Sequence, residues 1–252
     1  MSSFDVTADA YDRFMGRFSE PLAPVFLAFT GVKDGRVLDV GSGPGALTAL
    51  LQDRLGAGSV AAVDPSPRFV DALRRRCPAV DVREASAERL PFADGTFDVA
   101  LAQLVVHFMA DPVAGLREMR RVTRPGGVLA ACVWDHSGDE GPLSAFWRAA
   151  RDLDPRARGE ADLPGARPGH LEALLESAGL GAVRSDVLRV TVRFTTFDEW
   201  WEPFLLGVGP AGTYVAGLDA DRRAALRDRC AETLPERPFA VSAAAWAAMG
   251  TA

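Results

Sequence analysis

Two aspartates and three glycines in the first quarter of the chain are spaced to bind a nucleotide-like ligand. The segment RVLDVGSGPGALT, residues 36–48, is predicted to be a buried strand, a glycine-rich turn and the start of a helix. Gly41, Gly43 and Gly45 allow backbone torsions and a close ligand approach that a Cβ would block. The helix start also offers unpaired N–H groups. We therefore expect a ligand at this turn.

The two acids indicate which ligand binds there. Asp39 precedes Gly41 at the carboxyl end of an otherwise apolar strand. Because a buried carboxylate is costly unless a cation or donors meet it, Asp39 favours a ligand with a charged amino group, such as the methionine part of S-adenosylmethionine. Asp64 ends a second apolar strand, VAAVD, where an acid can bind both hydroxyls of a ribose. A dinucleotide site also fits the glycines, but it normally keeps the position of Asp39 apolar.

The elements that must position these residues alternate between strands and helices, which predicts a parallel sheet. Crossover helices are expected over residues 47–55, 68–76 and 112–121. The segment before the first strand is predicted to form two short helices, over residues 7–15 and 20–29. The last strands are expected over residues 182–194 and 239–250.

The motif DxGxGxG at Asp39, followed by Asp64, makes the chain resemble the class I S-adenosylmethionine-dependent methyltransferases that act on small molecules. The stretches YDRFMGRFSEPLA and SAERLPFADGTFDVALAQ resemble the same family. The resemblance implies a single α/β domain over residues 1–252. Its Rossmann-like sheet has seven mostly parallel strands, the last antiparallel, with helices on both faces. Residues 1–30 are expected to form a helical lid, 31–135 the cofactor-binding core, and 195–236 an insertion that caps the substrate.

The same resemblance names the cofactor, S-adenosylmethionine, and its product, S-adenosylhomocysteine. In most relatives an acid after the third strand accepts from the adenine amino group. Ser86 stands there in this chain and is a weaker acceptor, while Ala87 can offer its backbone N–H to the adenine ring. Tyr11 and Arg17 are expected to reach the ligand from the lid. The expected cofactor-binding residues are Tyr11, Arg17, Asp39, Gly41, Ser42, Gly43, Gly45, Asp64, Pro65, Ser86, Ala87 and Gln103.

His107 is the candidate catalytic residue. It follows the fourth predicted strand, at the edge where open α/β sheets bind ligands. Methyl transfer needs proximity, alignment and, for a hydroxyl acceptor, a base, and His107 could be that base. The alternative is a histidine that only caps or packs the loop. The candidate substrate-contacting residues are Phe14, Met15, His136, Trp200 and Trp201, with packing against the sheet or within the insertion as the alternative for the apolar ones.

Composition limits the possible partners. A net charge of −6 and an isoelectric point near 5.2 argue against a nucleic-acid partner, which needs a basic face. Cys77, Cys132 and Cys230 lack ligand spacing, so no metal is expected and reduced thiols in a cytoplasmic protein are favoured. No apolar run approaches the ~20 residues of a membrane span, so no membrane association is expected.

The sequence therefore predicts methyl transfer from S-adenosylmethionine to an oxygen, nitrogen or carbon of a small, apolar acceptor. One alternative is another reaction on this fold, such as a cyclisation that retains the cofactor, because a fold does not determine chemistry. The other alternative is a nicotinamide-dependent oxidoreductase, against which Asp39 argues.

Overall fold

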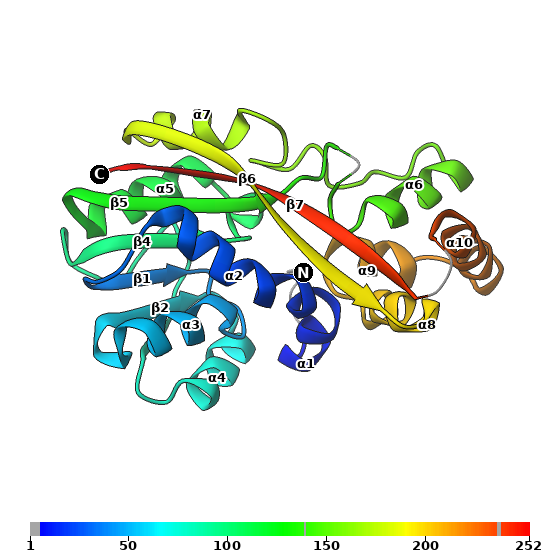
Figure 1. The fold of residues 1–252 in the computed structure, drawn as a ribbon, viewed down its shortest axis with the longest axis horizontal. Coiled ribbons are helices and arrows are strands. Elements are labelled where there is room, and N and C mark those ends of the chain that lie inside the picture. The colour runs from blue at the N-terminus through cyan, green and yellow to red at the C-terminus, as the bar shows by residue number, and fades with distance from the viewer. Residues whose placement is uncertain (1–5, 139, 236–237) are drawn as a thin grey trace.

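The seven strands in the part of the chain that the structure describes belong to one sheet. The computed structural model describes residues 6–138, 140–235 and 238–252. Across the sheet the strands are β3 (Asp81–Glu84), β2 (Val60–Asp64), β1 (Val37–Val40), β4 (Phe97–Gln103), β5 (Thr123–Trp134), β7 (Phe239–Thr251) and β6 (Gly181–Phe194). Strands β1 to β5 pair in parallel, and β7 is antiparallel to both of its neighbours (Figure 1). The predicted Rossmann-like sheet is confirmed.

Helices cover both faces of this sheet. On one face lie α2 (Arg17–Thr30), α3 (Ala46–Leu55) and α4 (Pro67–Arg76), which bury residues such as Phe26, Leu51 and Leu73 in one core cluster. On the other face lie α5 (Pro112–Val122) and α7 (His170–Ser177), with Leu116 and Leu175 in a second cluster. The apolar strands between the two layers are buried on both sides, as parallel strands usually are. Short 3-10 turns, η2 (Ala57–Ser59) and η3 (Val106–Phe108), complete this part of the chain.

The order of the strands places a crevice at the end of β1. Its neighbours are β2 on one side and β4 on the other, so the winding of the chain reverses there. Open α/β sheets bind ligands outside the carboxyl ends of the strands at such a point. The glycine-rich turn that follows β1 and Gln103 at the end of β4 therefore both face the expected site.

The N-terminal segment differs from the prediction of two separate helices. Helical structure runs from α1 (Ala8–Tyr11) through a π-helical turn, η1 (Asp12–Gly16), into α2 without a break. Phe14, Met15, Phe18, Leu22 and Phe26 are all buried, and this apolar stripe holds one continuous helical path against the body. The predicted helix start at Glu20 was wrong, since α2 begins at Arg17.

The segment between β6 and β7 forms a helical body at the end of a long hairpin. The two strands pair as far as Phe194 opposite Phe239. Between them lie α8 (Phe197–Trp201), η4 (Glu202–Leu206), α9 (Gly209–Ala216) and α10 (Ala220–Thr233). Helix α10 packs on α6 (Ser144–Leu153), where Arg229 forms an ion pair with Asp152 at 2.6 Å. Figure 1 shows these helices beyond the carboxyl ends of the parallel strands.

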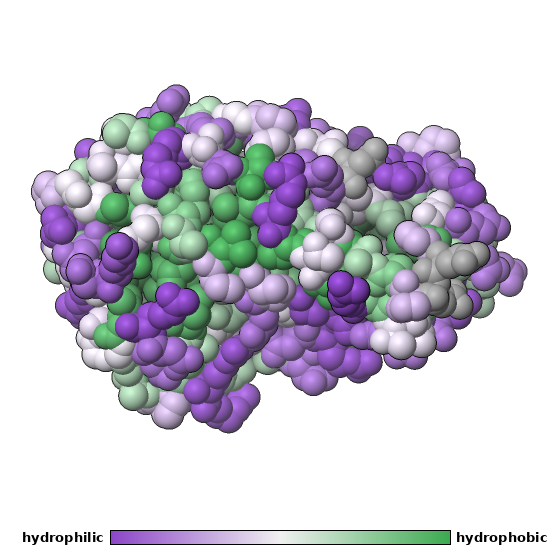
Figure 2. Space-filling model, viewed as in Figure 1, coloured by the Kyte–Doolittle hydropathy of each residue, from purple (hydrophilic) through white to green (hydrophobic). Residues whose placement is uncertain are grey.

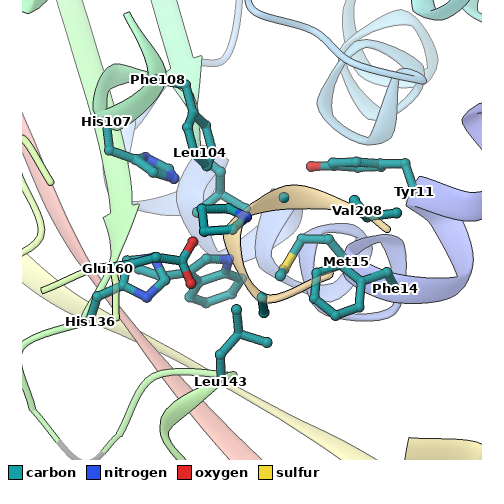
Figure 3. A pocket seen from close by; sticks show the side chains of 14 residues that line it. Tyr11, Phe14, Met15, Leu104, His107, Phe108, His136, Leu143, Glu160 and Val208 are labelled. Atoms are coloured by element: carbon teal, nitrogen blue, oxygen red, sulfur yellow. The ribbon is translucent and has the colours of Figure 1, made fainter. Parts of the chain in front are cut away.

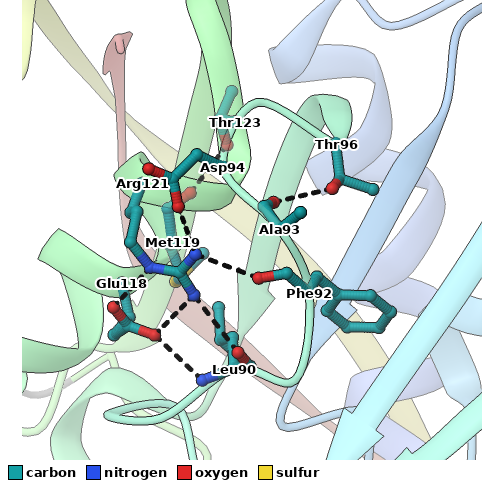
Figure 4. Close-up of polar contacts among 9 residues, drawn as sticks. All are labelled: Leu90, Phe92, Ala93, Asp94, Thr96, Glu118, Met119, Arg121 and Thr123. Carbon is teal, nitrogen blue, oxygen red and sulfur yellow. Dashed lines mark hydrogen bonds and ion pairs between the residues drawn. The ribbon is translucent and has the colours of Figure 1, made fainter.

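An arginine on α5 fixes the loop between β3 and β4. The Arg121 guanidinium forms ion pairs with Glu118 at 2.7 Å and Asp94 at 2.6 Å. It also donates to the carbonyl oxygens of Leu90 and Phe92, and Glu118 accepts from the Leu90 N–H (Figure 4). This network ties the segment that follows Ser86 to the body of the protein.

Apolar side chains gather at the centre of the face that Figure 2 shows, over α2 and the neighbouring strands. Polar side chains cover most of both ends of the molecule in this view. Within the described ranges, no helix has the length and apolar character that crossing a membrane requires.

Candidate active site

The three glycines of the turn after β1 differ in what surrounds them. All three have positive φ angles, +68° at Gly41, +53° at Gly43 and +101° at Gly45. A Cβ on Gly41 would collide with the Val105 side chain, and one on Gly45 with Leu73 of α4. A Cβ on Gly43 would meet nothing within 4 Å. Gly41 and Gly45 therefore serve packing, whereas Gly43 keeps open a space that a ligand can enter.

Asp64 closes this turn and remains available to a ligand. Its Oδ2 accepts from the Gly43 N–H and its Oδ1 from the Ser66 N–H, both at 2.8 Å. Burial raises the pKa of the carboxyl to about 6, although the two backbone donors favour the charged form. Because a carboxylate oxygen can accept more than one hydrogen bond, the two oxygens can still receive a pair of hydroxyl groups. This arrangement fits the ribose of the expected cofactor.

Asp39 lies deeper, with 1% of its surface exposed. Its Oδ2 accepts from the Thr48 hydroxyl at 2.6 Å, a bond between β1 and α3 that sequence reasoning did not anticipate. Burial raises the pKa of Asp39 to about 7 despite that bond. The carboxyl lines a cavity of about 20 Å³ beneath the turn, together with Ser42 and Gln103.

A cleft of about 560 Å³ opens along the carboxyl ends of β1, β2 and β4. Most of the predicted cofactor residues line it, namely Tyr11, Gly41, Gly43, Asp64, Pro65, Ser86, Ala87 and Gln103. Gln103 donates from Nε2 to the Ser19 carbonyl at 3.1 Å, while its buried Oε1 lacks a partner within the described ranges. An orphaned buried acceptor is rare in a folded protein, so Gln103 is placed to accept from a ligand.

Arg17, by contrast, does not line the cleft. Its guanidinium lies 5.0 Å from the centre of the Phe194 ring and donates to the Glu199 carbonyl at 3.1 Å. It thus ties α2 to β6 and α8. Glu88 was not predicted but lines the cleft, and it accepts from the Ala110 N–H at 2.8 Å. It holds the loop after η3 beside the cleft.

A third space, a cavity of about 30 Å³, adjoins the cleft, and we term it the chamber (Figure 3). Tyr11, Leu104 and Phe108 line both spaces. Leu104 has a positive φ of +63°, an unfavourable conformation for leucine, and it is held there by a bond from its N–H to the Cys132 carbonyl at 2.9 Å. The residues that line the chamber are Tyr11, Phe14, Met15, Leu104, His107, Phe108, Trp134, His136, Leu143, Glu160, Val208, Gly209, Pro210 and Ala211.

The chamber brings together most of the predicted catalytic and substrate residues. His107 from η3 and His136 after β5 have ring centres 5.8 Å apart. Burial, followed by the proximity of His136, holds the pKa of His107 well below its usual range, and burial lowers the pKa of His136 to about 4. Both imidazoles are therefore neutral at neutral pH. They can form hydrogen bonds there, but they hold an acquired proton poorly.

Trp200 and Trp201 do not line the chamber or the cleft. Each has 3% of its surface exposed and packs with Phe197 and Phe204 in the core. The insertion reaches the chamber instead through residues 208–211, at the start of α9.

Glu160, in the loop between α6 and α7, is the ionisable residue of the chamber that the sequence did not predict. Its loop, RARGEADLPG, shows no periodicity or motif that distinguishes this acid from a solvated one. In the structure Glu160 is 4% exposed.

Within the described ranges, no group of three or more metal-ligating side chains is close enough together to hold a metal ion.

The doubly wound sheet, the glycine-rich turn and the acids that end β1 and β2 define an α/β protein that binds a nucleoside-containing cofactor. The methyltransferase domain family matches residues 38–131. An uncharacterized protein of Mycobacterium tuberculosis is 32% identical over 199 residues, which cover 75% of this chain and 70% of that protein.

Solved structures share the fold at lower identity. Phosphoethanolamine N-methyltransferase 2 of Haemonchus contortus, in complex with S-adenosyl-L-methionine, has a TM-score of 0.60 and 15% identity, covering 97% of this chain and 56% of that one. The [4+2]-cyclase SpnF has a TM-score of 0.55 and 19% identity, covering 92% of this chain and 81% of that one. The chain belongs to the class I S-adenosylmethionine-dependent methyltransferases. S-adenosylmethionine is its cofactor, and supplies an activated methyl group bound to a sulfonium.

Proposed function

We propose that the protein transfers a methyl group from S-adenosylmethionine to an oxygen, nitrogen or carbon of a small, mostly apolar molecule. The main support for this proposal is that the chamber lies next to the cofactor cleft. Tyr11, Leu104 and Phe108 line both spaces. An acceptor in the chamber would lie beside a cofactor in the cleft. Proximity and alignment are most of what such a displacement requires.

In this proposal the cofactor residues lie along the cleft. Asp64 binds the ribose hydroxyls, Gln103 accepts from the methionine part, and Ser86 and Ala87 border the adenine. Tyr11 and the N-terminal helical segment act as the lid, and the insertion caps the acceptor. The three cysteines are free and buried, which is compatible with a cytoplasmic location.

Formation of S-adenosylhomocysteine tests the proposal. The protein is incubated with S-adenosylmethionine carrying a deuterated methyl group and a panel of small alcohols, phenols and amines. We expect an acceptor that gains the labelled methyl group in a one-to-one ratio with S-adenosylhomocysteine. Asp64→Asn serves as the control, and should lower the rate at subsaturating cofactor by about tenfold, because a hydrogen bond to a charged group contributes about 1.5–3 kcal/mol.

A panel member consumed without S-adenosylhomocysteine formation would contradict methyl transfer. It would favour the other reaction predicted from the sequence, in which the cofactor is retained. The fold supports either chemistry, since a cyclase shares it.

A further inference from the structure

Glu160 is a buried carboxyl group in the wall of the chamber. Its Oε2 accepts from the Trp147 Nε1–H at 2.8 Å. No arginine or lysine of the described residues is close enough to affect the charge of this carboxyl. A buried carboxyl without a cation is destabilising to the folded protein, and burial raises the pKa of Glu160 to about 7. The carboxylate form of Glu160 would therefore be stabilised by a positively charged partner.

The walls around Glu160 also suit a cation. Tyr11, Phe14, Phe108 and Trp134 contribute aromatic rings to the chamber, and the faces of such rings attract ammonium groups. Figure 3 shows the Glu160 carboxyl and the two imidazoles directed toward the same space. Because burial keeps both imidazoles neutral, none of the described residues that line the chamber carries a positive charge.

Three other polar atoms in the chamber lack partners within the described ranges, namely Nδ1 of His107, Nε2 of His136 and Nε1 of Trp134. Buried polar groups are nearly always hydrogen-bonded. Three buried polar atoms without hydrogen-bond partners around one cavity therefore indicate that a polar ligand group or ordered water binds among them. A cavity of about 30 Å³ holds about two waters, so the walls must separate for an acceptor to enter.

We propose that the acceptor is a small amine that enters the chamber as an ammonium ion, with Glu160 as its binding partner and proton acceptor. This inference rests on the proposed methyl transfer and specifies its substrate class. The amine nitrogen must be neutral when it attacks, since an ammonium has no free electron pair and is repelled by the sulfonium. Glu160 receives the proton of the ammonium. The freed electron pair forms the new N–C bond, and the sulfur keeps the pair of the broken C–S bond.

The structure favours Glu160 over His107 as the group that accepts the proton of the ammonium. A neutral imidazole surrounded by apolar walls holds a proton poorly. His107 and His136 instead accept hydrogen bonds from the amine and orient it. The charge on Glu160 and the ammonium charge compensate each other in a buried space, where such pairs are stronger than in bulk water.

Calorimetry with matched ligand pairs tests this inference. The protein, saturated with S-adenosylhomocysteine, is titrated with benzylamine and benzyl alcohol, 2-phenylethylamine and 2-phenylethanol, and cyclohexylamine and cyclohexanol. At neutral pH we expect at least one amine to bind about tenfold or more tightly than its alcohol. Glu160→Gln keeps the size of the side chain and an oxygen for the Trp147 N–H, and should abolish that preference while leaving affinity for S-adenosylhomocysteine unchanged.

Glu176→Gln, on the exposed face of α7, is the matched control and should behave as the wild type. Equal affinity for amine and alcohol in every pair, or an amine preference that survives Glu160→Gln, would overturn the proposal. The comparison of amine and alcohol affinities in the wild-type protein tests the amine preference even if Glu160→Gln fails to fold. If S-adenosylhomocysteine binds and the amines do not, only this inference fails. If an amine binds but no methylated product forms from S-adenosylmethionine, the proposed methyl transfer is what fails.

Discussion

Single residues of one turn can serve different purposes, as Gly41 and Gly43 illustrate. Both have a positive φ, +68° and +53°, so backbone conformation alone favours glycine at each. The side chain of Val105 fills the space beside Gly41, whereas the space beside Gly43 is open. The missing Cβ at Gly41 allows the loop after β4 to pack closely, and the missing Cβ at Gly43 leaves room in the cleft.

Alanine substitutions should separate these roles. Gly43→Ala should cost about 1–2 kcal/mol of stability, the usual strain of a left-handed non-glycine residue. It should also weaken S-adenosylhomocysteine binding by tenfold or more, because the new methyl group projects into the cleft. Gly41→Ala should lose considerably more stability, because its methyl group collides with Val105. Chemical denaturation and calorimetry measure the two effects.

Gly31→Ala provides a matched control for backbone strain. Gly31 has a φ of +73° and no atom within 4 Å of an added Cβ, and it ends α2 rather than lining the cleft. It should lose about as much stability as Gly43→Ala and retain full affinity. If Gly43→Ala also retains full affinity, the cofactor does not pass near this turn.

Residues of the candidate site that belong to a local motif could be predicted from the sequence. Residues that enter the site only through tertiary contacts could not. Gly41, Gly43 and Asp64 lie within fixed spacings of two strand ends, and the structure brings them together at the cleft. His107 and His136 each follow a parallel strand, as the sequence indicated, and both line the chamber. Glu160 could not be found, because only the packing of its loop against Trp147 makes it a buried acid.

At the scale of elements, the N-terminal helical segment and the insertion meet over the active site. Arg17 donates to the Glu199 carbonyl, and the ring of Phe14 lies 5.2 Å from that of Phe204. The sheet was predictable because short-range patterns define its strands and crossover helices. The helices of the insertion were not predictable, because their apolar residues are fixed by packing within the core cluster and no family motif marks them.

Trp200 and Trp201 should both contribute to stability rather than to acceptor binding. Both are 3% exposed, and replacing a buried tryptophan by alanine typically costs about 3–5 kcal/mol. We expect Trp200→Ala and Trp201→Ala each to lower the melting temperature strongly while folded protein keeps its affinity for S-adenosylhomocysteine. Circular dichroism and calorimetry provide the measurements.

Leu205→Ala, in the same insertion, is the control, because Leu205 is 48% exposed and surface substitutions usually stay within about 0.5 kcal/mol. Should either tryptophan variant keep its stability but alter the affinity of an acceptor, that ring contacts the substrate, as the sequence suggested. The two adjacent tryptophans then differ in role. Equal losses of stability identify the pair as core.

Across the whole molecule, buried ionisable groups make stability depend on pH. Burial raises the pKa of Asp39 and Glu160 to about 7 and that of Asp64 to about 6. The folded protein therefore binds more protons at these carboxyls than the unfolded chain does. His107 and His136 act oppositely, since their lowered pKa values make the unfolded chain bind more protons below about pH 6.5.

The sign of the net effect differs between two pH ranges. Above about pH 6.5 less than half of each unfolded histidine is protonated, so the carboxyls dominate, and stability falls as pH rises. Below that pH the histidines of the unfolded chain take up protons. This offsets the effect of the carboxyls, so stability changes less steeply with pH. For the cofactor-free protein we expect a loss on the order of 1–2 kcal/mol between about pH 6.5 and pH 8, measured by urea denaturation.

Glu160→Gln should reduce this loss, because the amide cannot be ionised and its burial costs the same at every pH. Relative to the wild type, the variant should therefore gain stability as the pH rises through about 7. Glu176→Gln, at an exposed position, should leave the pH profile unchanged. A Glu160→Gln profile parallel to that of the wild type would mean that Glu160 is solvated in solution. The chamber would then lack the buried carboxyl on which amine binding depends.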